Sequence, residues 1–145
     1  MSKGNIKKIG DAGEQYIVDH VLCPNCDKKL MKLPPNYPLA DVQCTACLFR
    51  AQVKTTSSRQ RQTICGAGWD IFEKVLKAGH LAPALIAHFL WKEGNATHHK
   101  VILYPFIPRK CLKKYQLSAQ ARRSKYRMFN YVNLGSIPSM VLLES

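Results

Sequence analysis

The stretch from Ala40 to Lys54 contains the residue types that metal-assisted phosphate chemistry needs. It predicts two short strands joined by a tight turn, with Asp41 near the start of the first strand and Gln52 and Lys54 on the second. Side chains alternate between the two faces of a strand, so Gln52 and Lys54 point the same way and Asp41 can lie beside them. A carboxylate, an amide oxygen and an ammonium group gathered at one point can hold Mg²⁺ beside a phosphate. The sequence therefore predicts a magnesium and phosphate site at Asp41, Gln52 and Lys54.

Four cysteines in this region have the spacing of a zinc site. Cys23 and Cys26 form one Cys-x-x-Cys pair, and after seventeen residues Cys44 and Cys47 form a second. Each pair offers two thiolates, and four thiolates complete a tetrahedron around zinc. A redox motif needs only one such pair, and disulfides are disfavoured in the cytosol. Four protein ligands leave no open coordination position, so we expect a structural zinc ion. We expect the other two cysteines, Cys65 and Cys111, to be ordinary buried or half-buried thiols.

The elements around this hairpin predict one α/β domain over residues 1–145, with a mixed sheet flanked by helices in three layers. Apolar residues at helical spacing predict helices over residues 6–22 and 67–78. The proline-rich segment 32–40 and the polar, glycine-containing segment 55–68 are expected to be loops.

The second half of the chain supplies the remaining strands. Two apolar runs, 83–92 and 100–108, predict neighbouring strands of a mostly buried sheet. This places His88 in the core and His98 and His99 in the connecting turn. Further along, the sequence predicts a short helix over 109–116, a closing strand over 129–134, and an apolar tail over 136–145 that packs back on the domain or meets a partner.

The charge of the chain points to a polyanionic partner. Lys and Arg total 22 against 9 Asp and Glu, a formal net charge of +13. Such an excess favours nucleic acid, because each phosphate that is neutralised releases a counterion. A membrane surface is disfavoured because we find no apolar run long enough for a span, no basic amphipathic helix and no lipidation signal. With no signal-peptide core at the amino terminus, we expect a cytoplasmic protein.

Two basic segments are candidate DNA contacts. The first is the segment 55–68, which carries Arg59 and Arg61. The second surrounds Tyr126 with four cations, whose guanidinium groups bind phosphates in bidentate fashion while the aromatic ring can stack on a base. Its cations are Arg122, Arg123, Lys125 and Arg127. The alternative for either segment is a solvated basic surface without a ligand.

The order of these residues resembles the PD-(D/E)xK nuclease superfamily. Glu14 in the first helix, then Asp41, then Gln52-Val53-Lys54 follow the order of that superfamily's acidic residues and lysine. More closely, the chain resembles the DpnI-like, Dam-replacing family of restriction endonucleases, which is directed to methylated GATC sites. The stretches that carry this resemblance are LCPNC, PLADVQCTACLFRAQVK, QTICGAG, LSAQARRS and NLGSIPS, and together they span nearly the whole chain.

The resemblance implies a role for each site residue. Asp41 would be the main Mg²⁺ ligand, Gln52 would take the place of the family's second acid, and Lys54 would polarise the attacked phosphate or orient the attacking water. Periodicity alone makes Glu14 a solvated helix residue, whereas the resemblance implies that it assists at the metal. Because Gln52 is neutral, the site has one negative charge fewer for holding Mg²⁺. A Gln-x-Lys version occurs among nucleases that resemble the methyl-directed Mrr enzymes.

We therefore expect a PD-(D/E)xK restriction-endonuclease-like mixed sheet with an inserted zinc-binding knuckle pair. The expected activity is Mg²⁺-dependent hydrolysis of phosphodiester bonds in double-stranded DNA. The alternatives are a catalytically weak or inactive nuclease-fold zinc protein that binds DNA, and an RNA-binding zinc protein. DpnI itself carries a carboxy-terminal winged helix that also reads methylated DNA, and the resembling stretches here do not include it, so target recognition is expected to rest on this domain, on a homodimer or on a separate recognition subunit.

Overall fold

The computed structural model describes residues 3–35, 37–114 and 128–145. These residues form a mixed α/β structure, which confirms the predicted fold class. Its main elements, in chain order, are α1 (Lys3–His20), β1 (Leu30–Lys32), β2 (Val42–Cys44), β3 (Arg50–Thr56), β4 (Ile64–Ala67), α2 (Trp69–Lys77), β5 (Ala84–Glu93), β6 (Ala96–Tyr104), the 3-10 turn η1 (Arg109–Cys111), β7 (Leu112–Lys114), β8 (Met128–Tyr131), the 3-10 turn η3 (Leu134–Ser136) and β9 (Met140–Glu144).

The strands form two sheets. The larger sheet has six strands in the order β1-β2-β3-β5-β6-β9. Only β3 and β5 pair in parallel, and the other neighbours pair antiparallel, so this sheet is mixed as predicted. A second, smaller sheet has three antiparallel strands in the order β4-β8-β7. This small sheet is not predicted from the sequence.

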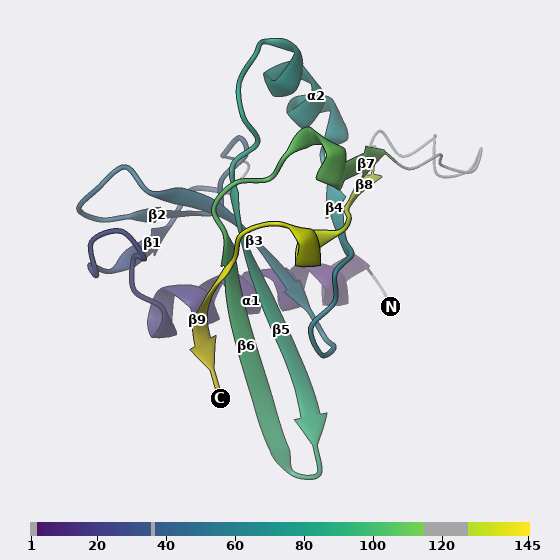
Figure 1. Ribbon diagram of the computed structural model, residues 1–145. Helices are drawn as coiled ribbons and strands as arrows, with labels where there is room; N and C mark the ends of the chain where they lie inside the picture. The colour runs from purple at the N-terminus through teal and green to yellow at the C-terminus, as the bar shows by residue number, and fades with distance from the viewer. Residues whose placement is uncertain (1–2, 36, 115–127) are drawn as a thin grey trace.

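The two faces of the larger sheet are covered by different layers. On one face, Ile17 and Val21 from the α1 region pack against strand residues such as Val53 and Ile86. On the other face, the side chains of β5 and β6 pack in one cluster with Phe72 of α2 and with residues of the small sheet. Figure 1 shows α2, β4, β7 and β8 gathered near one end of the long β5–β6 hairpin, while α1 runs across the strands. The three predicted layers are therefore present, with a small sheet and a helix together forming the third layer.

Close packing between α1 and β3 requires a glycine in the helix. A Cβ atom added to Gly13 would lie 2.7 Å from the Cβ of Thr55, closer than real Cβ contacts allow. The helix therefore approaches β3 at Gly13, one residue before Glu14. It begins at Lys3 and ends at His20, two residues before the predicted end, because the chain then turns into the first cysteine pair.

Two predicted segments differ from the structure. The segment 55–68 is not a continuous loop, because Thr55 and Thr56 extend β3 and Ile64–Ala67 forms β4. The segment 109–116 is not helical in its described part, which is a single 3-10 turn followed by β7. Both β4 and β7 are short strands, and among the described residues each pairs with β8, which lies far along the chain from β4. Local patterns do not reveal such pairings.

The histidines of the β5–β6 hairpin are placed differently from the prediction. His98 and His99 lie on β6 instead of in the turn, which is formed by Gly94 and Asn95. His88 is buried as predicted, and its Nε2 lies 2.8 Å from Nδ1 of His99. The apolar tail packs back on the protein, because β9 pairs with β6 at the edge of the larger sheet. In the part of the chain that the structure describes, neither helix has the length and apolar character needed to cross a membrane.

The contact at Gly13 generates a stability prediction. Gly13→Ala should lower the free energy of unfolding by about 1–3 kcal/mol, because overpacking pushes α1 away from β3. Gly10→Ala is the matched control, since an added Cβ at Gly10 meets no atom within 4 Å. That control should be neutral or should stabilise by up to about 1 kcal/mol, because alanine favours helix more than glycine. Urea denaturation measures both, and equal stabilities would contradict the packing of α1 on β3.

Candidate active site and metal centre

Asp41 is fixed between β2 and β3. Its backbone N–H donates to the carbonyl of Ala51 at 2.9 Å, and its carboxylate Oδ2 accepts a hydrogen bond from the backbone N–H of Val53 at 2.8 Å. The strand pairing Val42↔Ala51 continues this connection into the hairpin. Among the described residues, no hydrogen-bond partner is present for the other carboxylate oxygen, Oδ1. One oxygen of Asp41 thus holds the hairpin together, and the second keeps its lone pairs for a ligand.

Gln52 is buried where the two sheets meet. Its residue surface is only 8% exposed, so the face of β3 that carries it is turned towards another layer and away from solvent. The hydroxyl of Tyr131 on β8 donates to Oε1 of Gln52 at 2.6 Å. Burial raises the pKa of Tyr131, and the negative charge of Asp41 raises it further, so the phenol keeps its proton. Gln52 and Tyr131 are the buried members of one polar cluster, and Asp41 is its half-buried member.

Glu14 reaches this cluster from α1. Its pKa is raised to about 7, first by burial and then by the negative charge of Asp41. The positive charges of Lys32 and Lys54 act in the opposite direction and lower it. Charges perturb a pKa in this way only over short distances. The structure thus brings Glu14, Asp41 and Lys54 into one electrostatic neighbourhood, although their catalytic roles stay predictions.

The donor groups of this cluster suit a magnesium ion. Magnesium prefers oxygen ligands, and Glu14 and Asp41 supply carboxylates. Gln52 has an amide oxygen with two lone pairs, one of which accepts the hydrogen bond from Tyr131. Two carboxylates and one amide carry less negative charge than three carboxylates would. We therefore regard the cluster as a candidate magnesium site of reduced charge.

The four predicted zinc ligands come together in space. The sulfur atoms of Cys23, Cys26, Cys44 and Cys47 all lie within 4.8 Å of one another. Cys23 and Cys47 are 3.6 Å apart at their Sγ atoms, and Cys26 and Cys44 are 3.4 Å apart. Four sulfurs bound tetrahedrally at the usual zinc–sulfur distance are separated by about 3.8 Å. The cluster therefore has the geometry to hold a zinc ion.

Hydrogen-bond donors surround these sulfurs. Backbone N–H groups donate from Asn25 to Cys23 Sγ at 3.4 Å and from Ala46 to Cys44 Sγ at 3.3 Å. The side chain of Asn25 also donates to Cys47 Sγ at 3.5 Å, and mainly for this reason the pKa of Cys47 is lowered to about 6. Donors of this kind favour the thiolate, which is the form that binds metal.

The other two cysteines lie outside this cluster. Cys111 is buried, as predicted, but Cys65 on β4 is exposed, so the expectation of a buried or half-buried thiol is wrong for Cys65. Neither belongs to the group of cysteines that could hold a metal.

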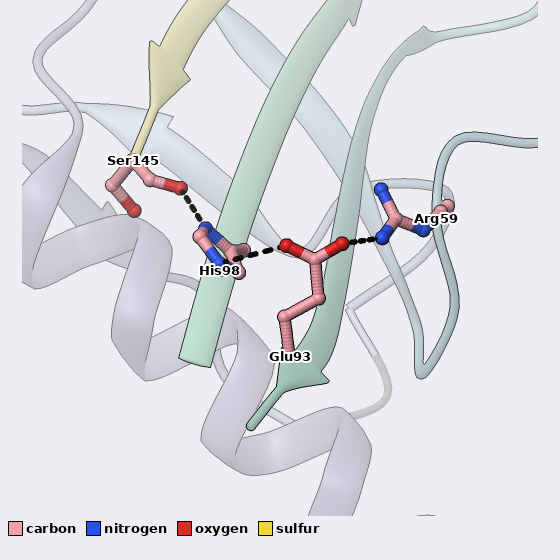
Figure 2. A network of polar contacts seen from close by, with 4 residues as sticks. All are labelled: Arg59, Glu93, His98 and Ser145. Atoms are coloured by element: carbon pink, nitrogen blue, oxygen red, sulfur yellow. Dashed lines mark hydrogen bonds and ion pairs between the residues drawn. The ribbon is translucent and has the colours of Figure 1, made fainter. Parts of the chain in front are cut away.

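The predicted DNA contacts are only partly described. Arg59 forms an ion pair with Glu93, and its guanidinium lies 5.4 Å from the centre of the Trp91 ring. Figure 2 shows this network continuing from Glu93 to His98 and from His98 to the backbone oxygen of Ser145. The charge of Arg59 is therefore partly balanced within the protein, whereas Arg61 is exposed. The four cations Arg122, Arg123, Lys125 and Arg127 lie outside the described residues.

Two residues of the cluster were missed from the sequence. Tyr131 was treated only as part of a closing strand, and Lys32 only as the first residue of a loop. Tyr131 is completely buried and Lys32 lies at the end of β1. The alternation of Phe129 and Tyr131 could have indicated a buried strand face, but only the fold shows that Gln52 is the partner of the phenol.

Comparison with known proteins supports the resemblance. The sequence model of the DpnI, Dam-replacing family matches residues 2–144, which is nearly the whole chain. A search of curated proteins finds no match.

The perturbed carboxyl group predicts a dependence of stability on pH. Between about pH 4.5 and pH 7 the folded protein holds a proton on Glu14 that the unfolded chain has lost, so this group destabilises the fold as the pH rises through that range. In metal-free buffer, Glu14→Gln should flatten this fall and raise the melting temperature at pH 7–8. Asp19→Asn, an exposed change on the same helix, is the control. Parallel melting profiles for the wild type and Glu14→Gln would contradict the burial of this carboxyl group.

The cysteine cluster predicts a zinc-dependent fold. Metal analysis should find one zinc per chain, and its removal should destabilise the protein by about 4 kcal/mol if zinc is present at a thousand times its dissociation constant. Cys47→Ser should lose the zinc and melt at a lower temperature. Cys65→Ser, at the exposed cysteine, should keep both the metal and the stability. An unchanged melting temperature after verified zinc removal would refute a structural role.

Proposed function

The chain belongs to the Dam-replacing family, and from this membership we propose that it is a Mg²⁺-dependent endonuclease that cleaves duplex DNA. The proposed reaction is hydrolysis of a phosphodiester bond, and the proposed targets are methylated sites of the GATC type. The observation that best supports the proposal is the grouping of Glu14 and Asp41 near Lys54. This grouping has the acidic and cationic components that cleavage of a phosphodiester requires.

The raised pKa of Glu14 supports a cation at this grouping. Without one, burial and the charge of Asp41 keep the Glu14 carboxyl half protonated near pH 7. An arriving cation reverses this balance, because a nearby positive charge favours the ionised carboxylate. Glu14 would then release its proton and become a second anionic ligand beside Asp41. The cluster is therefore suited to bind a divalent cation in exchange for a proton.

Each residue has a proposed task in the reaction. Asp41 and Glu14 would hold the metal, and Gln52 would supply an amide oxygen whose position is fixed by Tyr131. The chemistry that Mg²⁺ supplies when bound is neutralisation of phosphate charge and a lowered pKa for the attacking water. Lys54 contributes a positive charge to the phosphate and orients the water. The strands and α1 keep these groups in place, which reduces the entropic part of the barrier.

A second candidate function is DNA binding with weak cleavage or none. Gln52 favours it, because a neutral amide adds no charge to the metal site and its oxygen already accepts a hydrogen bond. The net charge of +13 supports binding to DNA in either case. The two candidates therefore differ only in the chemistry at the metal site.

Plasmid cleavage tests this proposal. With Mg²⁺, the wild type should nick or linearise plasmid that carries methylated GATC sites. Lys54→Ala should slow cleavage by about 100-fold or more without lowering the melting temperature, because it removes a charge used at the transition state. Lys92→Ala, an exposed lysine of the β5–β6 hairpin, is the control and should cut normally.

Gln52→Glu separates the two candidates in the same assay. Faster cleavage after this change would identify an enzyme whose metal site is short of one charge. If neither the wild type nor Gln52→Glu cuts methylated or unmethylated plasmid over a range of Mg²⁺ concentrations, the endonuclease proposal is refuted. Binding of the intact plasmid would then support the second candidate.

A further inference from the structure

A depression with a mixed polar and apolar lining lies at one end of the small sheet. Its volume is about 400 Å³. Among the described residues its lining contains no carboxylate and consists of Gln62, Lys110, Cys111, Asn133, Gly135 and Ser136. Residues that carry two carboxamides, a hydroxyl and an ammonium group therefore border one space. A positive charge without a counter-charge in the lining disfavours a metal ion and favours an anionic ligand.

The register of the small sheet explains why these residues meet. Ile64, Tyr131 and Leu112 form one row across β4, β8 and β7. Two residues beyond this row, at the same end of each strand, are Gln62, Asn133 and Lys110. Backbone bonds hold the segments together past the strand ends, with Val132 N–H donating to the Cys111 carbonyl at 2.8 Å and Leu134 N–H to the Gln62 carbonyl at 3.1 Å. Three segments remote in sequence thus place one polar side chain each at this end.

The side chains of the depression are closely fitted. A Cβ added to Gly135 would lie 2.8 Å from both Cδ and Nε2 of Gln62, so the carboxamide of Gln62 rests directly on this glycine. Asn133 has a left-handed backbone, with φ 55°, which asparagine tolerates better than most residues. Ser136 Oγ donates to the Asn133 carbonyl at 2.7 Å and fixes the turn that follows. The positions of Gln62 and Asn133 are therefore set by the backbone around them.

This arrangement matches the chemistry of a nucleotide. A carboxamide presents a donor and an acceptor side by side, which suits the edge of a nucleobase, and a lysine suits a phosphate. Resting on the proposed function, we propose that the depression binds a nucleotide of the DNA next to the cleavage site. Gln62 and Asn133 contact the edge of its base, and Lys110 contacts its phosphate.

The position of the depression agrees with this assignment. Asn133 is two residues along the chain from Tyr131, whose hydroxyl contacts Gln52 of the metal cluster. Two residues of extended chain span about 7 Å. This span separates the backbones of Tyr131 and Asn133, and it is comparable with the spacing of about two nucleotides, because neighbours of one strand are about 3.4 Å apart along a duplex axis. The same strand could therefore occupy both the metal cluster and the depression.

Binding measurements in a cleavage-deficient background test this inference. Lys54→Ala protein would be incubated with a pool of randomised duplexes, and the bound duplexes would be sequenced. Gln62→Ala and Asn133→Gly should each reduce the base preference at one position of the site, and Asn133→Gly does so without backbone strain. Gly135→Ala should act like Gln62→Ala, because its Cβ displaces the Gln62 carboxamide. Gln15→Ala, an exposed glutamine on α1, should leave the preference unchanged.

The phosphate contact is tested by the salt dependence of binding. Lys110→Ala should weaken binding to all duplexes alike and reduce the slope of log affinity against log salt by about 0.9. Lys92→Ala is the control, because the β5–β6 hairpin extends away from the small sheet (Figure 1). If all these variants bind DNA normally, with the base preference and the salt slope of the parent protein, this inference is overturned and the proposed function is not. A protein that binds no duplex DNA overturns this inference together with the proposed function.

Discussion

The structure depends on a polar contact buried between its layers, the hydrogen bond from Tyr131 to Gln52. Burying a carboxamide is costly unless its polar atoms find partners, and losing one partner costs about 1–3 kcal/mol. The small sheet satisfies this requirement by placing a protonated phenol against β3. The same bond fixes the amide that belongs to the candidate metal site. The packing of the third layer and the geometry of the site therefore have a common cause.

A neutral residue at position 52 follows from the same constraint. A carboxylate at this depth, near Asp41, would add a further negative charge to a partly buried cluster. Without a metal, such a charge would have to be protonated or paired with a cation. The pKa of Glu14 is raised first by burial and then by the negative charge of Asp41, so these two carboxyl groups already repel one another. The neutral Gln52 thus lowers the charge repulsion in the metal-free protein. It also leaves the candidate site with less negative charge for attracting a metal ion.

The sequence predicted those parts that depend on neighbouring residues. The cysteine pairs, the hairpin from Ala40 to Lys54, the second helix and the β5–β6 hairpin all have local signals in spacing, alternation or apolar runs. Of the small sheet only β8 was predicted, as a closing strand, because β4 and β7 have only three or four described residues each and are defined by pairing with β8. For the same reason Tyr131 could not be assigned to Gln52, which lies 79 residues earlier. The site residues on the hairpin from Ala40 to Lys54 were thus predictable from the sequence. The contact that the third layer makes with them, through Tyr131, was not.

The cysteine cluster connects the two elements that carry the acidic residues. Cys23 follows α1 after two residues, and Cys44 closes the strand that begins just after Asp41. A metal bound by all four cysteines therefore joins the end of the helix that carries Glu14 to the hairpin that carries Asp41. Because the folded protein assembles this site and the unfolded chain does not, a bound metal stabilises the arrangement and limits relative motion of the two segments in the folded protein. Zinc with four protein ligands has no open coordination position for a substrate or water, and a structural role needs none. A zinc ion bound here would contribute to the candidate site by keeping the two carboxylates at a fixed distance from each other.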